Sequence, residues 1–150
     1  MSIKIDHINI VTSDLESARE FFAALGFTVR RSGELAGSWI ANLTGLTNVK
    51  ADYIGMTLPN DSVVLELLEF HSPIGNKDDS ISQLNQIGYR HLALRVDNID
   101  EVIADLKSRN IQILSAVQSY EPLSKRLCYV IGPDGVVIEL AEYLKTGDEA

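Results

Sequence analysis

The 150-residue sequence has one cysteine, Cys128, which excludes an intrachain disulfide and is compatible with a reducing compartment. It has no apolar run near the roughly 20 residues of a membrane span, and its opening, MSIKIDHINIV, lacks the basic start and apolar core of a secretory signal. Clusters of lysine and arginine are missing too, and the net charge of −8 argues against nucleic acid or an anionic membrane as a partner. These absences predict a cytoplasmic acidic domain and do not exclude a small anionic substrate.

One long segment of the sequence occurs twice. The stretch DHINIVTSDLESAREFFAALGFTV, from Asp6, aligns without a gap with RHLALRVDNIDEVIADLKSRNIQI, which starts 84 residues later at Arg90. His7 falls on His91 in this alignment. Similarity over such a length indicates two copies of one structural unit.

A second pair of similar segments closes the two copies. VVLELLE, from Val63, and VVIELAE, from Val136, share five of their seven residues at an offset of 73. Each is an apolar run with a central glutamate, Glu66 or Glu139. A buried carboxylate is costly unless it is neutralised or meets a cation, so its recurrence at equivalent positions indicates a function.

The local pattern predicts a helix after the first strand of each copy. Apolar residues recur at helical spacing behind the capping-box patterns SDLE (residues 13–16) and NIDE (residues 98–101). Gly26 and Asn110 follow the two apolar stretches, and both residue types tolerate the left-handed backbone that ends a helix.

Alternating and apolar segments predict the strands. They cover residues 5–11, 28–31, 51–58 and 62–70 in the first copy and 91–96, 111–117, 126–131 and 136–142 in the second. A short helix is expected around residues 39–43 and a linking helix at about 77–88. The predicted fold class is α+β: a single domain over residues 1–150, in which two pseudo-symmetric βαβββ modules, about 3–70 and 89–143, form curved sheets around a cup.

Strand alternation places the repeated polar side chains on one face of each sheet. If the apolar residues of the first strands face the helices, His7 and His91 point away from them, and the repeat puts Glu66 and Glu139 on the same side. Two imidazoles and two carboxylates suit Zn, Ni, Co, Mn or Fe, and the carboxylates balance a +2 charge. A single strand histidine is more often structural, and a strand glutamate can protect a sheet edge. Four equivalent positions together favour a cup that binds one divalent metal ion.

The chain resembles the vicinal oxygen chelate superfamily, also called the glyoxalase/bleomycin resistance/dioxygenase fold. The matching pieces are DHINIVTSDLESAREFFAALGF, VVLELLEF, GYRHLALRVDNIDEVIADLKSRN and GPDGVVIELAEY. They span nearly the whole chain and include the four ligand positions. Within the superfamily the sequence looks nearest to glyoxalase I and methylmalonyl-CoA epimerase, although YVIGPDGVV stands where epimerases have an HPKSTGG-like stretch.

This resemblance implies an isomerase, epimerase or lyase. In the family, a divalent ion chelates two adjacent oxygens of a small substrate and stabilises the enolate or enediolate. A carboxylate ligand that detaches can move the proton, which implies that Glu66 and Glu139 are both ligands and catalytic bases. Two alternatives stay open: an extradiol ring-cleaving dioxygenase, and a non-catalytic resistance protein that binds a small molecule.

Asn9 and Arg95 share the face of the predicted ligands and are candidates for substrate binding. Asn9 would hydrogen-bond the substrate or orient a ligand. Arg95 would bind a carboxylate or phosphate of the substrate, or else lie solvated at a sheet edge. Lys125, on a predicted hairpin, is interpreted as a solvated edge residue in preference to an anion clip. The family resemblance also implies a homodimer.

Overall fold

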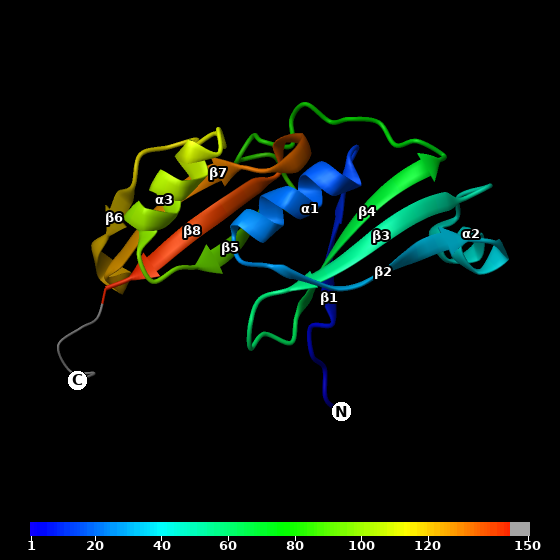
Figure 1. The fold of residues 1–150 in the computed structure, drawn as a ribbon, viewed down its shortest axis with the longest axis horizontal. Helices are drawn as coiled ribbons and strands as arrows, with labels where there is room; N and C mark the ends of the chain where they lie inside the picture. Colours follow the sequence, from blue (N-terminus) through cyan, green and yellow to red (C-terminus); the bar gives the residue numbers. More distant parts are fainter. Residues whose placement is uncertain (145–150) are drawn as a thin grey trace. The chain divides into compact units, whose positions relative to one another are not determined.

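The computed structural model describes residues 1–144, and the chain divides into two compact units between Lys77 and Asp78. Figure 1 shows the helices and strands of each unit. Unit 1 consists of β1 (His7–Val11), α1 (Leu15–Ala24), β2 (Thr28–Ala36), α2 (Ser38–Thr44), β3 (Lys50–Thr57) and β4 (Val64–Ser72). Unit 2 consists of β5 (His91–Arg95), α3 (Ile99–Ser108), β6 (Gln118–Tyr120), the 3-10 turn η1 (Glu121–Leu123), β7 (Lys125–Ile131), the 3-10 turn η2 (Pro133–Gly135) and β8 (Val137–Tyr143).

The two sheets have the same topology. Unit 1 has the strand order β1-β4-β3-β2, and unit 2 has the order β5-β8-β7-β6. In each sheet the first and last strands of the unit pair in parallel, and the other neighbours are antiparallel. The predicted α+β class with two βαβββ modules is therefore confirmed.

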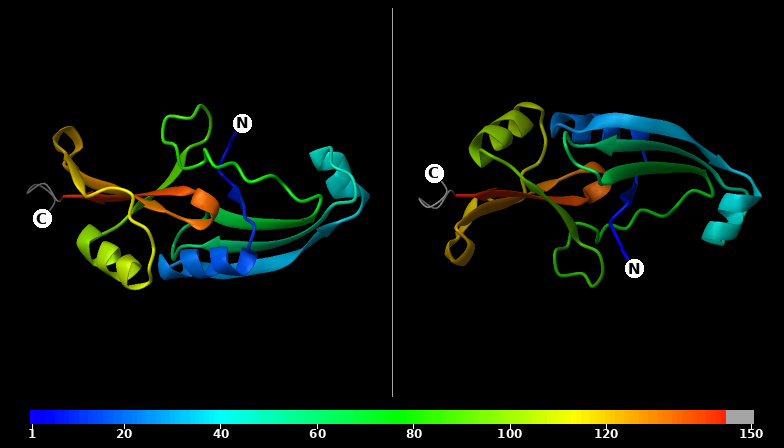
Figure 2. Two further views of the ribbon diagram at one scale, coloured as in Figure 1. Left: turned by 90° about the horizontal axis from the view of Figure 1, so that it is seen from above. Right: turned by 90° about the horizontal axis from the view of Figure 1, so that it is seen from below.

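Each unit packs its long helix against one face of its own sheet, as Figure 2 shows for α1 and α3. On α1, Ala18 and Phe22 are completely buried. The ring of Phe22 packs edge-on against the ring of Phe27, which follows the helix, with ring centroids 5.6 Å apart. On α3, Ile99 and Leu106 are completely buried. Burying one large apolar side chain stabilises a fold by about 1.5–3 kcal/mol, so these contacts decide which face of each sheet the helix covers.

The N-terminal caps of the two helices lie at equivalent positions of the repeat, although the capping-box pattern of the first copy begins one residue earlier. Asp14, not Ser13, caps α1, because its Oδ1 accepts a hydrogen bond from the backbone N of Ser17 at 2.9 Å. Asn98 caps α3 as predicted, accepting from the backbone N of Glu101 at 3.2 Å. Asp14 and Asn98 are equivalent in the repeat, so the alignment itself identifies both caps.

The predicted C-terminal ends of both helices are confirmed. Gly26 follows α1 with φ 94°, and Asn110 follows α3 with φ 60°. Both values lie in the left-handed region that glycine and asparagine adopt most easily, so the chain leaves each helix at the predicted residue. The short helix expected near residues 39–43 is α2.

Two predicted elements are wrong. Residues 77–88 form turns and not a linking helix: the side chain of Asp78 accepts from the backbone N and the Oγ of Ser80 at 2.9 and 2.7 Å. Bonds of this kind compete with helical hydrogen bonding. Residues 111–117 do not form a strand either, since a single bridge joins Ile113 to Val130 and β6 begins only at Gln118. In unit 1, by contrast, β2 extends beyond the predicted residues 28–31, because it stays paired with β3 as far as Ala36.

Candidate functional site

An imidazole and a buried carboxylate meet on neighbouring strands of unit 2. His91 Nε2 on β5 lies 3.2 Å from Glu139 Oε2 on β8, and the Glu139 side chain is only 7% exposed. The strand neighbours Ile138 and Leu140 are completely buried and point to the other face of β8. We call the face that carries His91 and Glu139, and the equivalent face of unit 1 with Asn9 and Glu66, the site face.

Lys125 completes this cluster. Its Nζ donates a hydrogen bond to Glu139 Oε1 at 2.6 Å, and its side chain is 16% exposed. In the register of β7 and β8, Lys125 pairs with Tyr143, whereas Glu139 pairs with Tyr129. The lysine side chain therefore runs along β8, past the small residue Ala141, to reach the carboxylate. The hydrogen bond to Glu139 raises the pKa of Lys125 above its ordinary value, which keeps the lysine positively charged at neutral pH.

Two tyrosine rings flank the cluster. The Tyr129 ring packs against the His91 imidazole with centroids 5.4 Å apart and an interplanar angle of 61°. Arg95 Cζ lies 4.9 Å from the centre of the Tyr143 ring, and Lys125 Nζ lies 5.7 Å from the same centre. Both distances are within the range of cation–π attraction, so Tyr143 holds two cations beside the imidazole–carboxylate pair.

Unit 1 presents the same residue types with different partners. Asn9 Nδ2 donates to Glu66 Oε1 at 3.0 Å, and these two residues face each other in the parallel register of β1 and β4. His7 Nδ1 lies 2.7 Å from Asp6 Oδ2, a contact that lowers the pKa of Asp6. A carboxylate on one ring nitrogen is the usual means of orienting a histidine whose other nitrogen binds a metal.

The structure therefore brings the predicted residues together in pairs. His91 meets Glu139, Asn9 meets Glu66, and Arg95 contacts an aromatic ring. Within residues 1–144, neither unit by itself gathers three or more His, Cys, Asp or Glu side chains into a group that could hold a metal ion. The four-ligand metal site stays a prediction.

The spacing of His91 and Glu139 fits a divalent ion. Two ligands about 2.1 Å from one ion are about 3.0 Å apart at a right angle and about 3.4 Å apart at the tetrahedral angle. The observed 3.2 Å between Nε2 and Oε2 falls between these values. Because Lys125 occupies Oε1, Glu139 would offer the ion one oxygen only.

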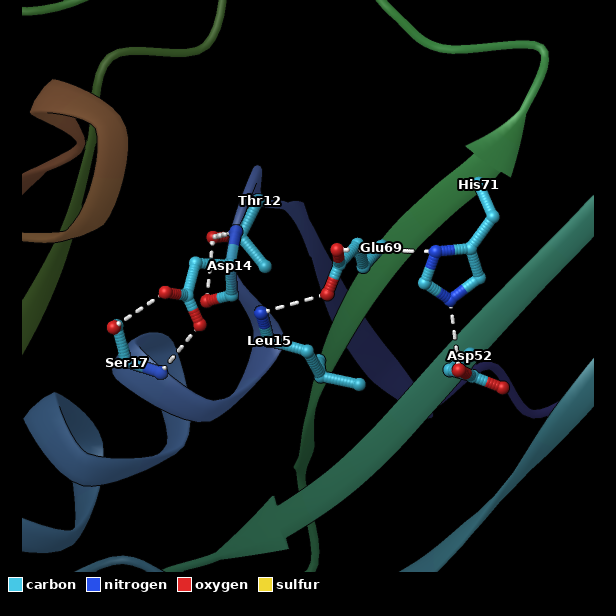
Figure 3. A network of polar contacts seen from close by, with 7 residues as sticks. All are labelled: Thr12, Asp14, Leu15, Ser17, Asp52, Glu69 and His71. Carbon is cyan, nitrogen blue, oxygen red and sulfur yellow. Dashed lines mark hydrogen bonds and ion pairs between the residues drawn. The ribbon is translucent and has the colours of Figure 1, made fainter.

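A second polar cluster lies on the helix side of unit 1, at the start of α1 (Figure 3). Glu69 Oε2 accepts a hydrogen bond from the backbone N of Leu15 at 2.9 Å. His71 Nε2 lies 2.8 Å from Asp52 Oδ2, a hydrogen bond that raises the pKa of His71. Glu69 and Glu66 are three residues apart on β4 and so point to opposite faces. This cluster anchors the helix and is not part of the site face.

Lys125 is not the solvated edge residue that was predicted, because its bond to Glu139 makes it part of the site. The hairpin turn contains the signal that could have found it. The two strands of the hairpin pair symmetrically about Asp134. Tyr129 and Glu139 are equally far from Asp134 in the chain, and they pair; the same is true of Lys125 and Tyr143. Counting outward from the turn thus puts Lys125 on the same face as Glu139.

The chain matches the family model described as Glyoxalase/Bleomycin resistance protein/Dioxygenase superfamily over residues 4–140. It is 29% identical to the uncharacterized protein YaeR of Escherichia coli (strain K12), over 93% of this chain and 95% of that protein. It is 25% identical to the mitochondrial methylmalonyl-CoA epimerase of Bos taurus, over 93% of this chain and 74% of that protein.

Two solved structures extend the comparison. A glyoxalase family protein from Bacillus cereus superposes with a TM-score of 0.89 at 30% identity, covering 97% of each chain. A variant of the fosfomycin resistance protein FosX from Listeria monocytogenes, complexed with Mn(II) and 1S,2S-dihydroxypropylphosphonic acid, shares the fold with a TM-score of 0.59 at 16% identity, covering 96% of this chain and 95% of that one.

In residues 1–144, no helix combines the length and apolarity that crossing a membrane requires. The match of the family model over most of the chain and the doubled βαβββ topology establish that this chain belongs to the glyoxalase/bleomycin resistance protein/dioxygenase superfamily.

Proposed function

We propose that this protein is a divalent-metal-dependent isomerase, epimerase or lyase that moves a proton on a small substrate with adjacent oxygens. The observation that supports this most strongly is the pair of His91 and Glu139, at the spacing of two metal ligands on the site face. His7 and Glu66 occupy the equivalent positions of the repeat. We propose that these four side chains, from one chain or from two, hold one Zn, Ni, Co, Mn or Fe ion.

The two carboxylates are suited to different tasks. A bound divalent ion supplies Lewis-acid activation, which acidifies a C–H next to a substrate carbonyl. Glu66 accepts a hydrogen bond from the neutral amide of Asn9, whereas Glu139 is paired with the ammonium group of Lys125. The ion pair with Lys125 fixes one oxygen of Glu139 in place, whereas Glu66 is held by a neutral amide only. Glu66 is therefore our first candidate for the base that removes the substrate proton and returns it, and Glu139 for the fixed ligand.

One relative supports the class of reaction, and another supports a metal ion that meets adjacent oxygens. The bovine protein is named an epimerase, and FosX is complexed with Mn(II) and a compound that has hydroxyls on adjacent carbons. We propose that Arg95, which lies against the Tyr143 ring, attracts an anionic group of the substrate. We also propose that the protein acts as a homodimer.

The proposal is tested by metal analysis combined with proton exchange. Purified protein should contain one divalent ion per chain by elemental mass spectrometry, and Glu66→Gln and Glu139→Gln should each lower that content. Small 2-hydroxy and 2-keto acids and their thioesters, incubated with the enzyme in D₂O, should gain deuterium at the carbon next to the carbonyl, as detected by proton NMR.

Glu69→Gln is the matched control, because it makes the same substitution on the helix side of β4, where Glu69 bonds the Leu15 amide. This variant should keep its metal and its exchange activity. A protein that binds no divalent ion after metal supplementation, or a Glu139→Gln variant with unchanged metal content, would refute the proposal. Sizing by light scattering as a monomer would refute the homodimer.

A further inference from the structure

The two site-face carboxylates differ in charge balance. Glu139 is 7% exposed and bonds Lys125 at 2.6 Å, whereas Glu66 bonds the amide of Asn9 at 3.0 Å. In unit 2, Lys125 pairs with the residue four positions after Glu139. The residue that pairs with the position four after Glu66 in unit 1 is Ala51, which has no charge. The lysine is therefore an addition to one copy of the repeat.

Lys125 affects the binding of any other cation to Glu139. A buried carboxylate requires a positive partner, and the ammonium group already supplies one at hydrogen-bond distance. A divalent ion bound between His91 Nε2 and Glu139 Oε2 would share the same carboxylate with that ammonium group. Two like charges that share one carboxylate in a partly buried place repel each other, and the screening by solvent is weak there.

We propose that Lys125 is a built-in counter-ion of Glu139, which neutralises this carboxylate in the metal-free protein and weakens the binding of a divalent metal ion at His91 and Glu139. The inference rests on the proposed metal site, and it assigns to Lys125 a role in setting the metal affinity. The lysine also explains how unit 2 tolerates a buried glutamate before the metal arrives, because the ion pair satisfies its Oε1.

The test compares metal affinity in variants of the full chain. Metal-stripped protein is titrated with Co²⁺ alone, with binding followed by calorimetry and by visible absorption of the bound ion. Lys125→Met should bind Co²⁺ at least about tenfold more tightly than wild type, a difference of about 1.4 kcal/mol. Lys125→Arg keeps the positive charge and should stay within about threefold of wild type.

Lys107→Met is a control for overall charge, because it makes the same substitution at an exposed position on α3 of the same unit. It should leave the Co²⁺ affinity unchanged. Thermal unfolding provides a second readout: metal-free Lys125→Met should melt at a lower temperature than wild type, and saturating Co²⁺ should raise its melting temperature by more than it raises that of wild type. If Lys125→Met does not fold, Lys125→Gln removes the charge and keeps a hydrogen-bond donor.

Each outcome decides between the two proposals. Tighter Co²⁺ binding by the neutral variants supports the counter-ion role. Equal or weaker binding by Lys125→Met, with metal bound to wild type and lost in Glu139→Gln, overturns the counter-ion role alone. Weaker binding would mean that the lysine instead orients the ligand. Failure of both wild type and Lys125→Met to bind Co²⁺ overturns the metal site and the counter-ion role together.

Discussion

Glu69 makes a hydrogen bond that joins the start of α1 to β4, and its removal should destabilise unit 1. The carboxylate accepts from the backbone N of Leu15 at 2.9 Å, and the side chain is 26% exposed. A hydrogen bond to a charged group contributes about 1.5–3 kcal/mol net, and a negative charge at a helix N-terminus adds about 0.3–1 kcal/mol. Partial exposure reduces both contributions, so we expect Glu69→Ala to lower the free energy of unfolding by about 2 kcal/mol.

The assay is urea unfolding at pH 7, followed by circular dichroism. With a denaturant slope of about 2 kcal/mol per M, typical of a small protein, the midpoint should fall by about 1 M. Glu69→Gln keeps an acceptor oxygen without the charge and should lose about half as much free energy. Hydrogen exchange of the Leu15 amide, measured by NMR, should accelerate in Glu69→Ala.

Glu16→Gln is the matched control, because Glu16 is a first-turn residue of the same helix with a 63% exposed side chain paired to Arg19. Its substitution should shift the midpoint too little to resolve, since exposed ion pairs of this kind stabilise weakly. A Glu69→Ala midpoint indistinguishable from that of Glu16→Gln would mean that water replaces the carboxylate at the helix start without loss of stability.

Two further predictions concern the helix caps and the histidine of the same cluster. Asp14→Ala and Asn98→Ala should each destabilise the protein by about 1 kcal/mol in urea unfolding, because each removes the acceptor of a backbone N–H in the first turn. Asp14→Ala should cost the more of the two, since Asp14 also accepts a hydrogen bond from Ser17 Oγ at 2.8 Å, and an unchanged midpoint in either variant would contradict the capping role. His71 should titrate by NMR above its ordinary pKa of 6.5, and Asp52→Asn should return it toward that value. Because folding raises this pKa, the stabilisation from His71 is fully present below pH 6.5 and lost as the pH rises through the folded value, so His71→Gln should cost more stability at pH 5.5 than at pH 8.

Much of the fold could be predicted because the signals are local or repeated. Left-handed residues end α1 and α3 at Gly26 and Asn110, where glycine and asparagine adopt that backbone with little strain. The gap-free alignment from Asp6 and Arg90 predicted one topology twice, and the structure has it twice. The predicted helix at residues 77–88 failed because side chains such as Asp78 bond nearby backbone and hydroxyl groups, which apolar periodicity does not reveal.

The two-module architecture and the residue types available for a site follow from the amino-acid sequence, because apolar periodicity and turn chemistry act over a few neighbours and the repeat extends them to both halves. The partner of each carboxylate, by contrast, is set by the packing of the folded chain. Glu66 and Glu139 stand in nearly identical segments, yet one meets an amide and the other an ammonium group from a different strand. The energy of a buried charge depends on distance and exposure, and both arise only when strands far apart in the sequence pair in a definite register.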